Sequence, residues 1–101
     1  MAKFIYARTA TNDAICVNVE RITSVSISAD DTLTIEFSKN DNGAGTIVLN
    51  LVGSATDAQE KTALLEVVNS IAGINAKVLT IKDDLTGEGL SNIVTVGAIT
   101  H

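Results

Sequence analysis

The chain contains no proline, and no stretch rich in glycine or serine separates one part of it from another. Linkers between domains are usually marked by such a change in composition. A length of 101 residues is enough for one hydrophobic core and too short for two ordinary domains. We therefore expect a single domain over residues 1–101.

Cysteine occurs once, as Cys16, which excludes both an intrachain disulfide and a zinc site built from several cysteines. Cys16 lies in the segment AICVNV, among apolar residues typical of a strand. That setting favours a small buried side chain. A reactive thiol and a disulfide between two copies of the chain are the alternatives.

Histidine also occurs once, as His101. A Ser-His-Asp or Cys-His arrangement would have to use it, and the end of a chain is a poor place to orient a general base. The paired acids Asp30-Asp31 and Asp83-Asp84 fit solvated turns, and nothing indicates a cleft for a catalytic carboxylate. We expect no enzyme activity, no catalytic residue, no cofactor and no metal ligand.

Two loops resemble ligand-binding motifs without completing them. In SKNDNGAGTIVL, placing Gly43 at the sixth position of a helix-flanked calcium loop puts Leu49 at the twelfth, where a bidentate glutamate is required. Less regular calcium coordination at an interface stays open as an alternative. The segment LTGEGLSN lacks the third glycine of a phosphate-binding loop and the helix that should follow it.

Charge of one sign is not gathered anywhere along the chain. The formal net charge is −5, and the seven basic residues are dispersed, whereas nucleic-acid-binding surfaces usually cluster Lys and Arg. No apolar run approaches the roughly 20 residues of a membrane helix, and the first residues do not follow the pattern of a signal peptide. We expect a soluble protein made in a cytoplasm, with no membrane partner and no small-molecule substrate.

Apolar residues are abundant but rarely aromatic. They make up 46% of the chain, and Phe4, Tyr6 and Phe37 are its aromatic residues. Most of the apolar content is therefore Val, Ile, Leu and Ala, of which the branched residues favour strands. Small domains have a high ratio of surface to volume, so self-association is the simplest way to bury the excess.

The clearest strand pattern is a hairpin in SVSISADDTLTIEF. Apolar residues alternate with polar ones over 25–27 and again over 33–37, and the acidic pair Asp30-Asp31 lies between them. The preceding segment is too long for one flat strand, and Ile22 breaks its alternation. We therefore expect a bend or bulge at residues 20–24.

The first segment, KFIYARTA, also alternates. Phe4, Tyr6 and Arg8 share one face of the expected strand, and Ile5 and Ala7 share the other. We expect both aromatic residues to pack in the core, because the chain has few other bulky side chains to fill it. A nucleic-acid contact through the aromatic face is the alternative.

One segment has the period of a helix, which we expect over residues 57–72. Thr56 and Gln59 form a capping-box pattern, and Gly73 fits the position after the last turn. The expected packing stripe consists of Leu64, Leu65, Val68, Ile71 and Ala72. The expected solvated face carries Glu60, Lys61, Glu66, Asn69 and Ser70.

These patterns predict a mainly β, α+β fold. We expect about six strands in a small, strongly bent antiparallel sheet or a partly open barrel, with one amphipathic helix packed on it. The predicted strands include 46–52, which is apolar on both faces, and the uncharged closing segment IVTVGAIT at 93–100.

The bent strand, hairpin and capped helix, seen in FIYARTATNDAICVNVERITSVSISADDTLTIEF and TIVLNLVGSATDAQEKTALLEVVNSIAG, resemble small proteins of marine tailed phages, many of them uncharacterised or assumed to be virion-associated. The arrangement is also similar to a small Sm-like barrel, although such proteins generally begin with a helix. The first resemblance implies a structural protein of the host cytoplasm or the virion. The second implies RNA contacts, for which Tyr6, Arg8 and Arg21 are the candidates.

Our leading hypothesis is a non-enzymatic assembly protein that forms a homo-oligomer through strand edges and through the apolar surface of 93–100 or of the helix. The alternative is an Sm-like RNA-binding module. A small enzyme or metal-dependent binder would need a pocket where Asp or Glu residues converge.

Overall fold

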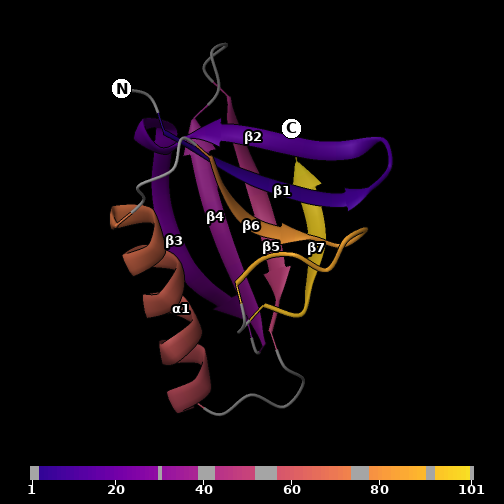
Figure 1. Cartoon of the computed structure of the whole chain (residues 1–101). Helices are drawn as coiled ribbons and strands as arrows, with labels where there is room; N and C mark the ends of the chain where they lie inside the picture. The colour runs from indigo at the N-terminus through magenta and orange to yellow at the C-terminus, as the bar shows by residue number, and fades with distance from the viewer. Residues whose placement is uncertain are drawn as a thin grey trace.

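The computed structural model describes residues 3–29, 31–38, 43–51, 57–73, 78–90 and 93–100. Within these residues the chain forms seven strands and one α-helix (Figure 1). The elements, in chain order, are β1 (Phe4–Ala10), β2 (Asp13–Asn18), a 3-10 helix (Val19–Arg21), β3 (Ile22–Ala29), β4 (Thr32–Ser38), β5 (Ala44–Asn50), α1 (Asp57–Ala72), β6 (Val78–Asp83) and β7 (Thr95–Thr100).

The strands form two sheets that do not close into a barrel. One sheet has the order β2-β1-β6 and the other the order β3-β4-β5-β7. This confirms the predicted class, mainly β with one helix. The antiparallel part of the prediction holds for every pair except β1 and β6, which run parallel. Parallel pairing is possible there because four strands, β2 to β5, and α1 lie between β1 and β6 in the chain.

The bend predicted at residues 20–24 is confirmed, and it carries the chain from one sheet to the other. The 3-10 helix Val19–Arg21 separates β2 from β3, and its first turn is capped by the Asn18 side chain, whose Oδ1 accepts a hydrogen bond from the Glu20 amide at 2.9 Å. The register of β3 also shifts between Ile22 and Ser24. A single run of residues therefore contributes an edge strand to each sheet.

The predicted hairpin is confirmed as β3 and β4. Its turn places Asp31 at φ 61°, in the left-handed region that Asp tolerates better than most residues. The alternation over 33–37 directs Leu33, Ile35 and Phe37 into the core, where all three are buried.

The core is apolar and lies between the two sheets and α1. Ile5, Ile35, Ile47, Leu49 and Ile81 are among its fully buried members. Strands of both sheets supply these residues, and α1 adds Ala63 and Val67.

The helix has the predicted bounds, Asp57–Ala72, but it packs with a different face. The buried residues are Ala63 and Val67, whereas Leu65 is 46% exposed and Val68 is 41% exposed. Of the predicted stripe, Leu64 and Ile71 contact the core, and Leu65, Val68 and Ala72 do not lie in it. The apolar residues span a stripe wider than the contact with β3 and β6 can cover, so docking selects one side of it.

Of the two predicted helix caps, only the one at Gly73 falls within the described residues. Thr56 lies outside the described residues. At the other end the Gly73 amide donates to the Asn69 carbonyl at 2.9 Å, so the helix ends where the sequence predicts.

Candidate interaction surface

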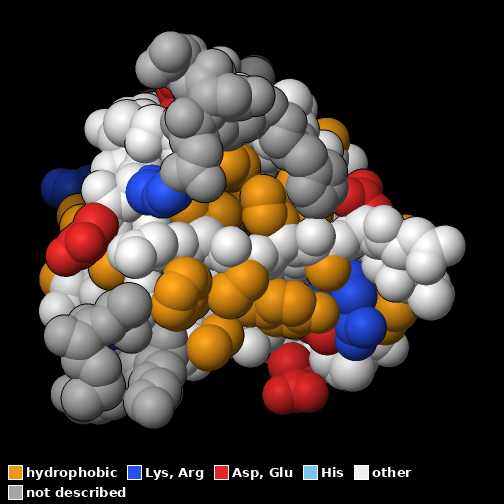
Figure 2. Space-filling view, turned by 90° about the horizontal axis from the view of Figure 1, so that it is seen from above, with side chains coloured by type: hydrophobic (Ala, Val, Ile, Leu, Met, Phe, Trp, Pro, Cys, Tyr) orange, Lys and Arg blue, Asp and Glu red, His pale blue; other side chains and the backbone are white. Residues whose placement is uncertain are grey.

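The β2-β1-β6 sheet has one face toward the core and one face that no described element covers, which we call the outer face. Strand register places Tyr6 of β1 opposite Cys16 of β2 and Thr80 of β6. Because side chains two residues apart share a face of a strand, the same side of the sheet carries Phe4, Tyr6, Ala14, Cys16, Asn18, Val78 and Thr80. Seen from above, Figure 2 shows hydrophobic side chains gathered across the middle of the molecule.

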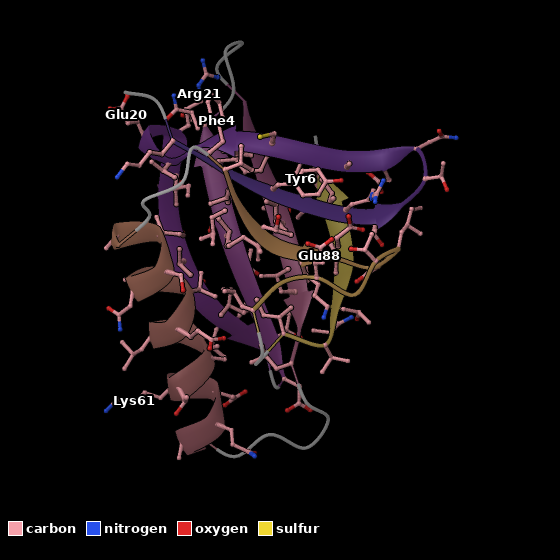
Figure 3. All side chains as sticks on the ribbon, viewed as in Figure 1. Phe4, Tyr6, Glu20, Arg21, Lys61 and Glu88 are labelled. Atoms are coloured by element: carbon pink, nitrogen blue, oxygen red, sulfur yellow. The ribbon has the colours of Figure 1, made fainter. Side chains whose placement is uncertain are left out.

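The expectation that Phe4 and Tyr6 pack in the core is wrong. Both are only partly buried, and they lie on the outer face (Figure 3). The core side of β1 is occupied by Ile5 and Ala7, each with no exposed area. Aliphatic β1 side chains thus fit between the sheets, and two of the three aromatic residues of the chain are left at the surface.

The expectation of a buried Cys16 is also wrong, because its side chain is exposed. It lies directly opposite Tyr6 on the outer face, whereas its neighbour Val17 points inward and is buried. Partial desolvation raises the pKa of the Cys16 thiol, so the neutral form predominates near neutral pH. The residue therefore contributes a small, weakly polar side chain to this face.

The ion pair between Arg8 and Asp83 lies at one margin of the outer face. Arg8 donates to Asp83 with both ends of its guanidinium, Nε to Oδ1 at 2.9 Å and Nη2 to Oδ2 at 2.7 Å. Asp83 also accepts from the Leu85 amide at 3.0 Å. The hydrogen bonds from Arg8 hold the pKa of the Asp83 carboxyl below its usual range, and the Asp83 carboxylate raises the pKa of Arg8.

The prediction that the acidic pair at 83 and 84 consists of solvated turn residues is therefore wrong. Asp83 is 5% exposed and neutralises Arg8. Both Asp84 carboxylate oxygens accept from the Val96 amide, at 3.0 and 3.1 Å. These two consecutive acids brace the end of β6 against β1 on one side and β7 on the other.

The three RNA-contact candidates are only partly brought together. Tyr6 and Arg8 share the outer face, but Arg8 is held by Asp83. Arg21 lies in the 3-10 helix beside the start of β1, where the Val19 amide donates to the Lys3 carbonyl at 2.9 Å (Figure 3). Arg21 and Arg8 are therefore at opposite ends of β1, and the three residues do not converge on one point.

Sequence reasoning missed Val78, which is 47% exposed at the Phe4 end of the outer face. The alternation of Val78, Leu79, Thr80 and Ile81 was the available signal. It did not reveal that β6 lies beside β1, because that contact joins distant parts of the chain.

The predicted surface at 93–100 is only partly available. Ile93 and Val96 are buried in the core, and Val94 is 50% exposed. The backbone of Val96 is also occupied on the side away from β5, because its amide donates to Asp84 and its carbonyl accepts from Thr9 Oγ1 at 3.2 Å.

No group of three or more His, Cys, Asp or Glu side chains is placed to hold a metal ion among the residues that the structure describes. The loop considered for calcium has residues 39–42 outside that part of the chain. In the same described part, no helix is long and apolar enough to cross a membrane.

Comparison of the chain with protein-family models, with curated proteins and with solved structures finds no match. A fold alone does not define a function, so the case for one rests on the chemistry of the outer face.

Proposed function

We propose that this protein is a non-enzymatic structural or assembly protein that associates with further copies of itself through the outer face of the β2-β1-β6 sheet. The observation that carries the proposal is the position of Phe4 and Tyr6. These aromatic side chains lie outside the core, next to each other on the central strand of a sheet with an uncovered face.

The composition of the outer face supports burial against another surface. Ala14 and Cys16 are exposed beside the aromatic residues, and Val78 is half-exposed at one end. The one charged group that register places among them, Arg8, is neutralised by Asp83. A mainly apolar face with paired charge at its margin is typical of a protein interface.

The proposed biological setting follows the resemblance to phage proteins. We propose that the assembly works in the cytoplasm of a host cell or, if the chain is phage-derived, as part of the virion. The outer face supports association between copies of the chain, and such association is compatible with both the host cytoplasm and the virion.

Sedimentation velocity over a range of concentrations tests the proposal. We expect wild-type protein to associate at micromolar concentration and Tyr6→Lys to remain monomeric, because the added charge would have to be desolvated in the interface. Leu65→Lys is the matched control, since it places the same charge on an exposed apolar site of α1. A monomeric wild-type protein at about 100 µM, well above the Kd of a weak but specific complex, would refute the proposal.

A second candidate is single-stranded RNA binding by the same face. It is favoured by one observation, the partly exposed pair Phe4 and Tyr6 on a sheet surface, because bases stack on such aromatic platforms. The net charge of −5 and the pairing of Arg8 with Asp83 weigh against it. Fluorescence anisotropy with a labelled single-stranded RNA pool tests it: binding that weakens with salt and with Tyr6→Ala would support this function, and no binding at low salt would remove it.

A further inference from the structure

The two sheets contact each other where β1 and β6 of one sheet meet β7 of the other, a contact that we call the seam. Elsewhere the sheets are joined by α1, which contacts β3 and β6 and lies along β3 in Figure 1. The helix contributes apolar side chains to this junction, Ala63 and Val67. The seam is different, because polar groups of three strands also meet there.

Asp84, the residue after β6, bonds to both of the other strands at the seam. Its carboxylate oxygens accept from the Val96 amide of β7 at 3.0 and 3.1 Å, and its own amide donates to the Arg8 carbonyl of β1 at 2.9 Å. Thr9 of β1 adds a second contact, because its Oγ1 donates to the Val96 carbonyl at 3.2 Å. Asp84 therefore holds β7 with its side chain and β1 with its main chain.

Asp83 fixes the position from which Asp84 reaches β7. The Asp83 side chain is 5% exposed and accepts from two nitrogens of Arg8 and from the Leu85 amide. Its main-chain amide donates to the Glu88 carbonyl at 2.8 Å. We call Asp83 and Asp84 together the acid clasp, since their two carboxylates tie the end of β6 to β1 and to β7.

The strength of the acid clasp depends on its negative charge. A hydrogen bond to an ionised acceptor is roughly twice as strong as one between neutral groups. A protonated carboxyl becomes a donor at one oxygen and no longer neutralises Arg8, which is left as an unpaired charge in a partly buried position. Arg8 holds the pKa of the Asp83 carboxyl below its usual range, so this bond persists until the solution is distinctly acidic.

Among the described residues, Arg8 of β1 is the charged group that faces the acid clasp from another element. β7 has the sequence TVGAIT and contains no titratable side chain. On β6, Lys82 directs its Nζ to the Gly87 carbonyl at 3.3 Å, and Glu88 in the following segment is exposed. The acid of β2, Asp13, pairs with Ala10 at the turn after β1. The two clasp carboxylates and Arg8 therefore determine how the seam responds to pH.

We propose that the acid clasp is a pH-sensitive switch, which holds the seam closed while its carboxylates are ionised and lets β7 separate from β1 and β6 in acid. The opening is local, because β3, β4 and β5 are joined by main-chain ladders that contain no titratable group. It uncovers Ile93 and Val96, which are 2% and 4% exposed while the seam is closed. The proposal goes beyond self-association and does not depend on it.

Hydrogen exchange on the wild-type protein tests the switch directly. The measured quantity is the protection factor, the exchange rate relative to that of the unfolded chain at the same pH. Between neutral pH and about pH 3, where most carboxyls are protonated, protection of the Val96 amide should fall about tenfold or more relative to that of the Ile35 amide in β4. Binding of an apolar fluorescent dye should rise over the same range. Unchanged relative protection of Val96, or equal loss at Val96 and Ile35, would overturn the proposal.

Asp84→Asn, with Glu88→Gln as its matched control, tests the switch at neutral pH. Asparagine keeps the shape of the side chain and one acceptor oxygen but removes the charge, as protonation does. Glu88→Gln removes one charge from an exposed side chain of the segment that follows β6. We expect Asp84→Asn to lower protection of the Val96 amide about tenfold and to bind the dye, and Glu88→Gln to behave like wild type. Wild-type protection in Asp84→Asn would overturn the proposal, and the wild-type pH series decides the matter if this variant does not fold.

Discussion

The side chain of Glu60 in the first turn of α1 accepts a hydrogen bond from the main-chain amide of Asp31, with 3.0 Å between Oε2 and N. Asp31 is the turn residue with φ 61° between β3 and β4, and its carbonyl accepts from the Leu51 amide at 2.9 Å. Glu60 therefore ties the helix to the hairpin tip. Its predicted place on the solvated face of the helix is wrong.

Replacing Glu60 with Ala should lower the free energy of unfolding by about 1–2 kcal/mol, because the partly buried Asp31 amide loses a charged acceptor. Urea unfolding at neutral pH measures the change. Lys61→Ala, one residue further along on an exposed site, should change stability by less than about 0.5 kcal/mol. Equal effects of the two substitutions would show that the contact with Asp31 contributes nothing.

The Arg8–Asp83 pair predicts a pH dependence of stability. The folded-state pKa of Asp83 is lowered, so its contribution is fully present above the unfolded value of about 3.9 and is lost as pH falls through the lower folded-state pKa. Melting temperatures measured between roughly pH 2 and pH 6 should fall steeply with acid in wild type and less steeply in Asp83→Asn. Parallel curves for the two proteins would contradict this assignment.

Substitution of two neighbouring valines distinguishes the buried face of α1 from its exposed face. Val67 has no exposed area and Val68 is 41% exposed. Val67→Ala should cost roughly 2 kcal/mol through lost burial and the cavity it leaves, and Val68→Ala less than about 0.5 kcal/mol. Chemical denaturation of both variants is the measurement. A larger loss of stability in Val68→Ala than in Val67→Ala would instead support the packing stripe that the sequence predicts.

Gly45 allows β5 to pass close to Phe37. A Cβ at this position would overlap the Phe37 ring and lie 2.6 Å from the Thr100 carbonyl oxygen. Gly45→Ala should therefore destabilise the protein by about 1–3 kcal/mol. At Gly97 a Cβ would meet the movable side chain of Asn50 at 3.1 Å, so Gly97→Ala is the milder control. Thermal unfolding compares the two, and a harmless Gly45→Ala would mean that the ring has room to move.

The local sequence pattern was sufficient to predict those elements whose two faces differ in polarity. In β4 the apolar positions alternate with Thr34 and Glu36, so the inward direction of Leu33 and Ile35 follows from the period of a strand alone. The bend after β2, the hairpin turn at Asp31 and the helix Asp57–Ala72 were predictable for the same reason, since each depends on residues close together in the chain.

The sequence by itself determined the strands, the turn and the helix of this protein, because period and capping act over a few neighbouring residues. Only the tertiary structure decided which face of β1 enters the core, because both faces carry apolar residues and the choice depends on the fit of Ile5 and Ala7 between two sheets. It also decided the partner of Asp83, since Arg8 is 75 residues away and reaches it only through the parallel pairing of β1 with β6. The partly exposed aromatic residues of the outer face result from those long-range choices, which no local pattern encodes.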